Sequence, residues 1–166
     1  MRVVLLGDSH LARVQRDLPR IGPDVVNAAV GGSVAGDVLA QAAQVGVGPD
    51  DVAVLSIGTN DDMPANDVAL SVFGARITEV AAQLHPARWV YVTPPLPESA
   101  AYGDTGRAAL EEAHPDVVVV DTVALLEPLG ARAFLEDDLH LTGAAYDLLL
   151  PAVAAAVGTL DTATGA

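Results

Sequence analysis

A short apolar run followed by a polar turn opens the chain: residues 3–10 read VVLLGDSH. The apolar residues 3–6 predict a β-strand, because an unbroken run of this length is typical of a strand that is covered on both faces. Gly7 and Asp8 then predict a turn, and Ser9 stands where the following helix should begin. A hydroxyl at such a strand-to-helix turn is presented at the N-terminus of the helix.

The same alternation continues along the chain. Further β-branched runs predict strands at residues 24–28, 52–57, 88–93 and 116–120. Alanine-rich stretches between them predict helices near residues 10–19, 36–45, 66–84, 101–113 and 143–157. This order predicts an α/β fold, a three-layer α/β/α sandwich around a parallel five-stranded sheet. We expect a single domain over residues 1–158 and a frayed C-terminal tail over residues 159–166.

Two histidines sit at helix-to-strand joints, in the dipeptides His85-Pro86 and His114-Pro115. Proline cannot continue a helix, and a histidine in the last turn suits the helix dipole. Both histidines are therefore interpreted as structural.

The composition excludes several classes of function. The 166 residues carry a net charge of −14, with 22 acidic residues against 8 basic ones. All the basic residues are arginines, so a P-loop lysine and a Schiff-base lysine are excluded. The acidic surface disfavours nucleic acid and anionic membranes as partners. The chain has no cysteine, which excludes disulfides, thiolate metal sites and a cysteine nucleophile.

No targeting segment or membrane span is evident in the sequence. Only four apolar residues follow Arg2, fewer than a signal peptide needs, and no run of 18 apolar residues occurs. We expect a cytoplasmic protein without a membrane partner, although the mature form of an exported protein would look the same.

Polar residues gather directly after the predicted strands. In a parallel sheet, ligands bind outside the carboxyl ends of the strands, so these residues are the candidates for chemistry. Besides residues 7–10, they are found at residues 27–33 (NAAVGGS) and 58–62 (GTNDD), and before the last helix at residues 137–142 (DDLHLT).

These residues include the parts that acyl transfer requires: a nucleophile, a base, a group that orients the base, and donors for an oxyanion. Ser9 is the candidate nucleophile and His140 the candidate base, with Asp137 three residues before it to hold the imidazole. The Gly32 N–H and the Asn60 amide can donate to an oxyanion. Each residue alone also has a structural explanation, as a helix cap or a tight turn.

Together these residues resemble the four sequence blocks of the SGNH (GDSL-type) hydrolases, and the resemblance extends from the first strand to the final helix. The blocks are Gly7-Asp8-Ser9, then Gly32, then Gly58-Thr59-Asn60-Asp61, then Asp137-Asp138-Leu139-His140. The resemblance implies a flavodoxin-like fold and a serine esterase or lipase-like activity that needs no metal or organic cofactor. It implies roles as nucleophile for Ser9, base for His140, orienting residue for Asp137, and oxyanion donors for the Ser9 N–H, Gly32 and Asn60.

One position departs from the family. His10 follows the serine where these hydrolases usually have leucine, which leaves the triad unaffected but places the substrate preference near Ser9 in question. Four loop residues at the same edge of the sheet are candidates for an apolar wall against the substrate, together with His10: Met63, Pro95, Leu96 and Tyr102.

The predicted substrate is a short-chain or acetyl ester of a small neutral metabolite or sugar. A thioesterase or lysophospholipase of the same family is an alternative, and a catalytically silent binding module on the same fold is another. Asp8 and His10 also fit the Asp-x-His motif of metal-dependent phosphoesterases, but the other motifs of those enzymes are absent, so no metal is expected. The ordinary α/β-hydrolase and dinucleotide-binding motifs are absent too.

Overall fold

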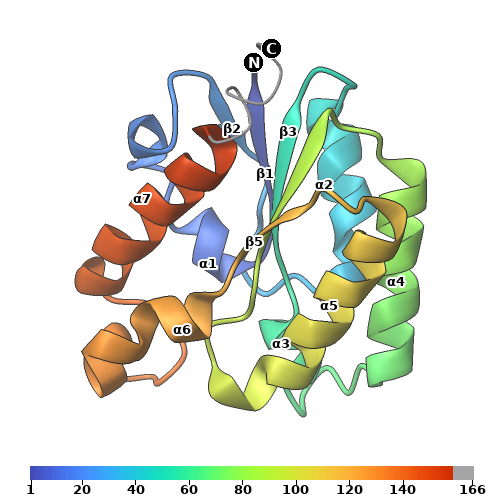
Figure 1. Cartoon of the computed structure of the whole chain (residues 1–166). Helices are drawn as coiled ribbons and strands as arrows, with labels where there is room; N and C mark the ends of the chain where they lie inside the picture. The colour runs from blue at the N-terminus through green and yellow to red at the C-terminus, as the bar shows by residue number, and fades with distance from the viewer. Residues whose placement is uncertain (159–166) are drawn as a thin grey trace.

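The computed structural model describes residues 1–158, so the tail predicted at residues 159–166 lies outside the described residues. Its centre is a parallel sheet with the strand order β2-β1-β3-β4-β5 (Figure 1). The strands are β1 (Val3–Gly7), β2 (Val25–Asn27), β3 (Val52–Ser56), β4 (Arg88–Val92) and β5 (Val118–Val120). The predicted α/β sandwich with a parallel five-stranded sheet is therefore confirmed.

Helices cover both faces of this sheet. The α-helices are α1 (Ser9–Ala12), α2 (Val38–Val45), α3 (Thr59–Asp62), α4 (Leu70–Gln83), α5 (Ala100–Ala113), α6 (Thr122–Leu126) and α7 (Gly143–Gly158). Short 3₁₀ segments are η1 (Leu18–Arg20), η2 (Ala35–Asp37), η3 (Pro97–Ser99) and η4 (Glu127–Ala133). In Figure 1, α1, α6 and α7 lie on one side of the sheet, and α2, α4 and α5 lie on the other.

The alternation of side chains along each strand gives two apolar cores. Val3 and Leu5 of β1 pack in the cluster that includes α7, whereas Val4 and Leu6 pack in the cluster that includes α2 and α4. All four side chains are buried, because both faces of a parallel sheet are covered. This explains why the sequence of β1 shows an unbroken apolar run.

Several predicted boundaries were wrong. The helix expected over residues 10–19 ends at Ala12, and helical backbone resumes only as η1, in which Pro19 occupies one of the first positions. The helix expected over residues 66–84 begins only at Leu70, because Asp67 has a left-handed φ of 47° that interrupts the helix. Two short helices, α3 and α6, were not predicted. His85 and His114 follow the last turns of α4 and α5 instead of lying in them.

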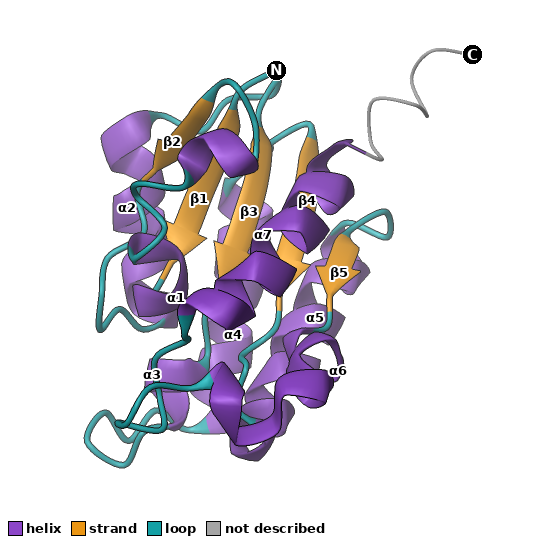
Figure 2. Cartoon of the chain, turned by 90° about the vertical axis from the view of Figure 1, so that its left-hand side faces the viewer, coloured by secondary structure: helices purple, strands orange, loops and turns teal. Residues whose placement is uncertain are grey.

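The carboxyl ends of the strands all lie at one edge of the sheet. Figure 2 shows the arrowheads of the strands pointing toward α1, α3 and α6. The polar residues that follow β1 and β3 therefore share this edge, as expected for a doubly wound sheet. Among residues 1–158, no helix has the length and apolarity needed to cross a membrane.

Candidate active site

The turn after β1 places Ser9 at the start of α1. Gly7 has a φ of +130°, and a Cβ there would overlap the carbonyl oxygen of Ser56 on the neighbouring strand, so this position requires glycine. Asp8 then caps α1, since its Oδ1 accepts a hydrogen bond from the His10 N–H at 3.0 Å. Ser9 as a residue is 8% exposed, so the start of α1 is largely buried.

A tight loop before α7 carries His140 and Asp137. His140 Nδ1 lies 2.6 Å from Asp137 Oδ2, and because a carboxylate only accepts, Nδ1 carries the proton. Asp137 Oδ1 also accepts from the backbone N–H groups of His140 at 2.9 Å and Leu139 at 3.1 Å. The hydrogen bond from the His140 ring and these two backbone bonds hold the pKa of Asp137 well below its usual range. Asp137 is therefore ionised, and the neutral imidazole of His140 is held in the tautomer in which Nε2 is the accepting nitrogen.

Asp138, the adjacent carboxylate, has a different role. Its φ is +54°, and its N–H donates to the Leu135 carbonyl at 3.0 Å, so it forms the turn of the loop. The three-residue spacing therefore selects Asp137 as the partner of His140.

The loop after β2 lies against Ser9. A Cβ on Gly31 would come within 3.8 Å of the Ser9 Cβ. Gly32 has a φ of +82°, and a Cβ there would meet nothing within 4 Å, so its position is open as well as left-handed. The Asn60 side chain on α3 donates from Nδ2 to the Ser33 carbonyl at 3.0 Å. An amide nitrogen has two protons, so Asn60 keeps a second one for another acceptor.

Asp61, the neighbour of Asn60 on α3, forms hydrogen bonds at the end of the same loop. Its carboxylate accepts from the Ala35 N–H at 3.0 Å and 3.2 Å, and its side chain is buried. Burial, aided by the negative charges of Asp8 and Asp37, raises the pKa of Asp61 to about 6, although the Ala35 hydrogen bond opposes this shift. α3 thus ties the Ser33–Ala35 segment to the end of β3 through two adjacent side chains, Asn60 on Ser33 and Asp61 on Ala35.

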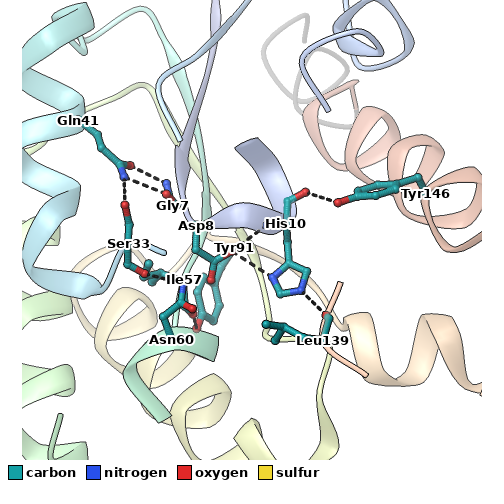
Figure 3. A network of polar contacts seen from close by, with 10 residues as sticks. All are labelled: Gly7, Asp8, His10, Ser33, Gln41, Ile57, Asn60, Tyr91, Leu139 and Tyr146. Atoms are coloured by element: carbon teal, nitrogen blue, oxygen red, sulfur yellow. Dashed lines mark hydrogen bonds and ion pairs between the residues drawn. The ribbon is translucent and has the colours of Figure 1, made fainter. Parts of the chain in front are cut away.

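Gln41 on α2 completes the support of this edge. Its amide accepts from the Gly7 N–H at 2.7 Å, donates to the Gly7 carbonyl at 2.8 Å, and donates to Ser33 Oγ at 2.9 Å (Figure 3). Sequence reasoning missed Gln41 and gave Ser33 no role of its own within residues 27–33. The available signal was a glutamine on the buried face of a helix that is otherwise rich in Ala, Val and Leu.

His10 was expected near the substrate, but its side chain is only 2% exposed. Its Nδ1 lies 3.1 Å from Asp8 Oδ1, and its Nε2 lies 3.1 Å from the Leu139 carbonyl oxygen. Figure 3 shows the ring between these two partners, with the Tyr146 hydroxyl donating to the His10 carbonyl. His10 therefore faces the His140 loop, and its ring does not line an open surface.

The structure brings the candidate nucleophile and base into the same neighbourhood. His10 follows Ser9 directly, and the centres of the His10 and His140 rings lie 6.5 Å apart. Within residues 1–158, no hydrogen bond joins Ser9 Oγ to His140 Nε2. Catalytic hydrogen bonds are often long before substrate binds and shorten in the complex with substrate.

The four loop residues expected to form an apolar wall do not act together. Pro95 lines a groove of ≈ 630 Å³ between α5 and α6 that Met63, Leu96 and Tyr102 do not line. The Tyr102 hydroxyl donates instead to the Val68 carbonyl at 2.6 Å, and its ring packs edge-on against Phe73. The groove is mostly apolar and includes Pro94, Val123, Leu126 and Phe134.

The Asp-x-His motif at Asp8 and His10 would require further metal ligands close to these two side chains. In the described part of the chain, no three His, Asp, Glu or Cys side chains gather closely enough to hold a metal ion. Asp8 and His10 contact each other, and His140 contacts Asp137.

Comparisons with known proteins agree with this fold. Residues 6–148 match the GDSL-like lipase/acylhydrolase family. Since this match spans most of the chain, the protein belongs to the GDSL-like lipase/acylhydrolase family. A search of curated proteins found no match to this sequence.

Solved structures show the same architecture at low sequence identity. The lipase/acylhydrolase from Enterococcus faecalis superposes with a TM-score of 0.77 at 19% identity, over 96% of this chain and 97% of its own. TesA gives a TM-score of 0.68 at 19% identity, over 96% and 97% of the two chains. The aryl esterase of M. smegmatis gives 0.63 at 17% identity, over 96% and 99%. At such identities the likeness establishes the fold alone.

Proposed function

We propose that this protein is a serine esterase in which Ser9 is the nucleophile, His140 the general base and Asp137 the residue that orients His140. The observation that carries the proposal is the 2.6 Å contact between His140 Nδ1 and Asp137 Oδ2. It fixes the tautomer that leaves Nε2 able to accept a proton. The loop that holds this pair lies beside the helix that begins at Ser9.

In the proposed reaction, Ser9 Oγ attacks the ester carbonyl carbon while its proton passes to His140 Nε2. The tetrahedral intermediate then collapses, and the alcohol leaves with the proton from His140. Water attacks the resulting acyl-enzyme, again giving a proton to His140, and the acid departs as Ser9 recovers its proton. Asp137 remains ionised and stabilises the imidazolium that forms in each half-reaction.

Three donors are proposed to stabilise the oxyanion: the Ser9 N–H, the Gly32 N–H and the second Asn60 Nδ2 proton. Asn60 is held by its bond to the Ser33 carbonyl, Gln41 donates to Ser33 Oγ, and Asp61 accepts from the Ala35 N–H two residues further on. Donors that are fixed before the reaction stabilise the developing charge without reorganisation. The buried network around the loop therefore supports its role as one wall of the oxyanion hole.

The proposed substrate is a small uncharged ester whose apolar part enters the groove between α5 and α6. Phe134 lines this groove and pairs with Leu141, the residue after His140, so the groove borders the catalytic loop. Asp104, Asp121 and Glu127 also line it, together with one cation, Arg107. The three carboxylates outnumber this arginine and disfavour anionic substrates such as acyl-CoA or phospholipid headgroups.

The proposal is tested by steady-state hydrolysis of a panel of p-nitrophenyl acetate, butyrate and octanoate, together with acetyl-CoA and acetylated sugars. We expect the neutral esters to be hydrolysed and Ser9→Ala to lose nearly all of this activity. Ser71→Ala, at an exposed serine of α4, is the matched control and should behave like the wild type. Equal activity in Ser9→Ala and wild type would contradict the proposal. Preference for acetyl-CoA would favour the thioesterase alternative.

A further inference from the structure

His10 joins the two segments on which the proposed reaction depends. Its backbone belongs to α1, directly after Ser9, while its ring reaches the carbonyl of Leu139, the residue before His140. These partners are 129 positions apart in the sequence. Figure 3 shows that the ring of His10 bridges Asp8 and Leu139.

The two partners of the ring have one property in common: both only accept hydrogen bonds. Asp8 Oδ1 is a carboxylate oxygen, and the Leu139 oxygen is a backbone carbonyl, each 3.1 Å from a ring nitrogen. A neutral imidazole carries one N–H, so one of these contacts would set two lone pairs against each other. The imidazolium has two N–H groups and satisfies both contacts.

The charges around His10 favour the same state. Asp8 Oδ2 is buried without a hydrogen-bond partner among residues 1–158, so a cation on the His10 ring would stabilise this carboxylate. Burial of the ring opposes its charging, but the hydrogen bond and charge of Asp8, with the Leu139 carbonyl, outweigh this and raise the pKa of His10. Arg13, on the same side of the site, acts in the opposite direction.

Other titratable side chains lie near the pair of His10 and Asp8. Asp61 of α3 interacts electrostatically with Asp8, the Tyr146 hydroxyl of α7 donates to the His10 carbonyl at 2.9 Å, and the His140 ring lies 6.5 Å away. Because His10 and Asp8 together form a neutral pair, the cation adds little repulsion to an imidazolium on His140.

We propose that His10 is a positioning residue that fastens the His140 loop to the helix of the nucleophile by donating from both ring nitrogens, to Asp8 and to Leu139. This inference rests on the proposed function and assigns His10 a role distinct from substrate contact. We call the contacts of the His10 ring with Asp8 and Leu139 the clamp. The clamp sets the position of His140 relative to Ser9, and a displacement of about 1 Å in such a pair can slow a reaction roughly 10²-fold.

The clamp predicts a second ionisation in the pH dependence of the reaction. His140 must be unprotonated to act as base, so activity rises with pH on the acid side. The folded-state pKa of His10 is raised, so its second N–H is present below that pKa and is lost as the pH rises through it. Activity should therefore decline again on the alkaline side as the clamp releases the loop.

The kinetic test compares His10→Gln with wild type over the full pH range, using p-nitrophenyl acetate. Glutamine can donate to Leu139 but cannot bridge both partners in the charged form. We expect kcat to fall about 10-fold to 100-fold with KM within about twofold, and the alkaline decline to disappear. The matched control is His114→Gln, because His114 Nε2 also lies 3.1 Å from a backbone carbonyl, that of Ala81, far from this edge. His114→Gln should keep the wild-type profile.

A spectroscopic measurement tests the clamp independently of activity. Long-range ¹H–¹⁵N spectra of the wild-type protein, recorded from about pH 5 to about pH 9 and assigned by comparison with His10→Gln, should show a proton on both ring nitrogens of His10 that is lost only above the pKa of a free histidine, about 6.5. Loss of one His10 ring proton at or below that value would overturn the inference even if the protein hydrolyses esters. If kcat of His10→Gln declines at alkaline pH as it does in the wild type, whatever the melting temperature of the variant, the inference is overturned as well. If no ester is hydrolysed, the proposed function fails, and the spectrum alone decides whether the clamp exists.

Discussion

Two adjacent carboxylates, Asp137 and Asp138, differ only in their geometry, and this difference can be measured. Asp137→Asn keeps the shape of the side chain but removes the charge that stabilises the His140 imidazolium. We expect kcat to fall by about 10²-fold or more, though less than in His140→Ala. Asp138→Asn is the matched control: asparagine tolerates the left-handed backbone at this position, so kcat should stay near the wild-type value. The reverse order of effects in steady-state kinetics would show that Asp138 is the partner.

Asn60 allows a similar separation of chemistry from stability. Asn60→Ala removes a donor that acts on the transition state, so kcat should fall about 10²–10³-fold with little change in KM. It also removes the bond to Ser33, so the melting temperature should drop. Asn66→Ala removes a neighbouring amide that donates to the Asn60 carbonyl at 2.7 Å and should lower only the melting temperature. Kinetics and thermal melts on the same samples distinguish an oxyanion donor from a residue that only stabilises the loop. A normal kcat in Asn60→Ala would show that Asn60 does not take part in the reaction.

Among individual residues, those that could be inferred from the sequence were the ones marked by a pattern of near neighbours in the chain. The spacing of Asp137 and His140 suffices to place one beside the other, because both lie in one tight loop. The Asp8–His10–Leu139 contact has no such signal, since it joins residues that only the fold brings together. A histidine after Ser9 suggests substrate contact from sequence alone, but the structure buries it.

The short helix α3 is the element that holds the loop after β2, and Asp61 makes this contact sensitive to pH. The pKa of Asp61 is raised to about 6 by burial, so between about pH 4 and pH 6 the folded chain binds more protons than the unfolded chain. Ionisation of Asp61 therefore lowers the free energy of unfolding as the pH rises through this window.

Asp61→Asn removes this ionisation and keeps an oxygen that can accept from the Ala35 N–H. We expect the melting temperature of the variant to be higher than that of wild type at pH 7. At pH 4 this difference should be smaller or negative. Thermal melts at both pH values measure the difference, and groups that titrate in both proteins cancel from it. An identical difference at pH 4 and pH 7 would contradict a raised pKa at Asp61.

The strands could be predicted from the sequence and the short helices could not. Continuous apolar runs located each strand to within two residues, because both faces of the sheet are buried. α3 and α6 have four and five residues, and tertiary contacts rather than a periodic pattern hold helices this short. The Asp61–Ala35 contact stabilises α3, and Asp121 caps α6 by accepting from the Ala124 N–H at 3.0 Å.

For the whole molecule, the groove between α5 and α6 should decide how long an acyl chain is accepted. Ala124 is exposed and lines this groove, so Ala124→Trp would fill it without disturbing the core. We expect KM for p-nitrophenyl octanoate to rise about tenfold or more, while p-nitrophenyl acetate is hydrolysed within about twofold of wild type. Ala82→Trp, at an exposed position of α4, is the control and should change neither value. Equal effects on both esters would show that the groove does not hold the acyl chain.

The central claim, that Ser9 is an activated nucleophile, is tested most directly by covalent labelling. The protein is incubated with a fluorophosphonate, digested, and mapped by mass spectrometry, with Ser9→Ala and Ser71→Ala treated in parallel. We predict one adduct, on the peptide that contains Ser9, in wild type and Ser71→Ala, and none in Ser9→Ala. An unlabelled wild-type protein, or an adduct that persists in Ser9→Ala, would contradict the account.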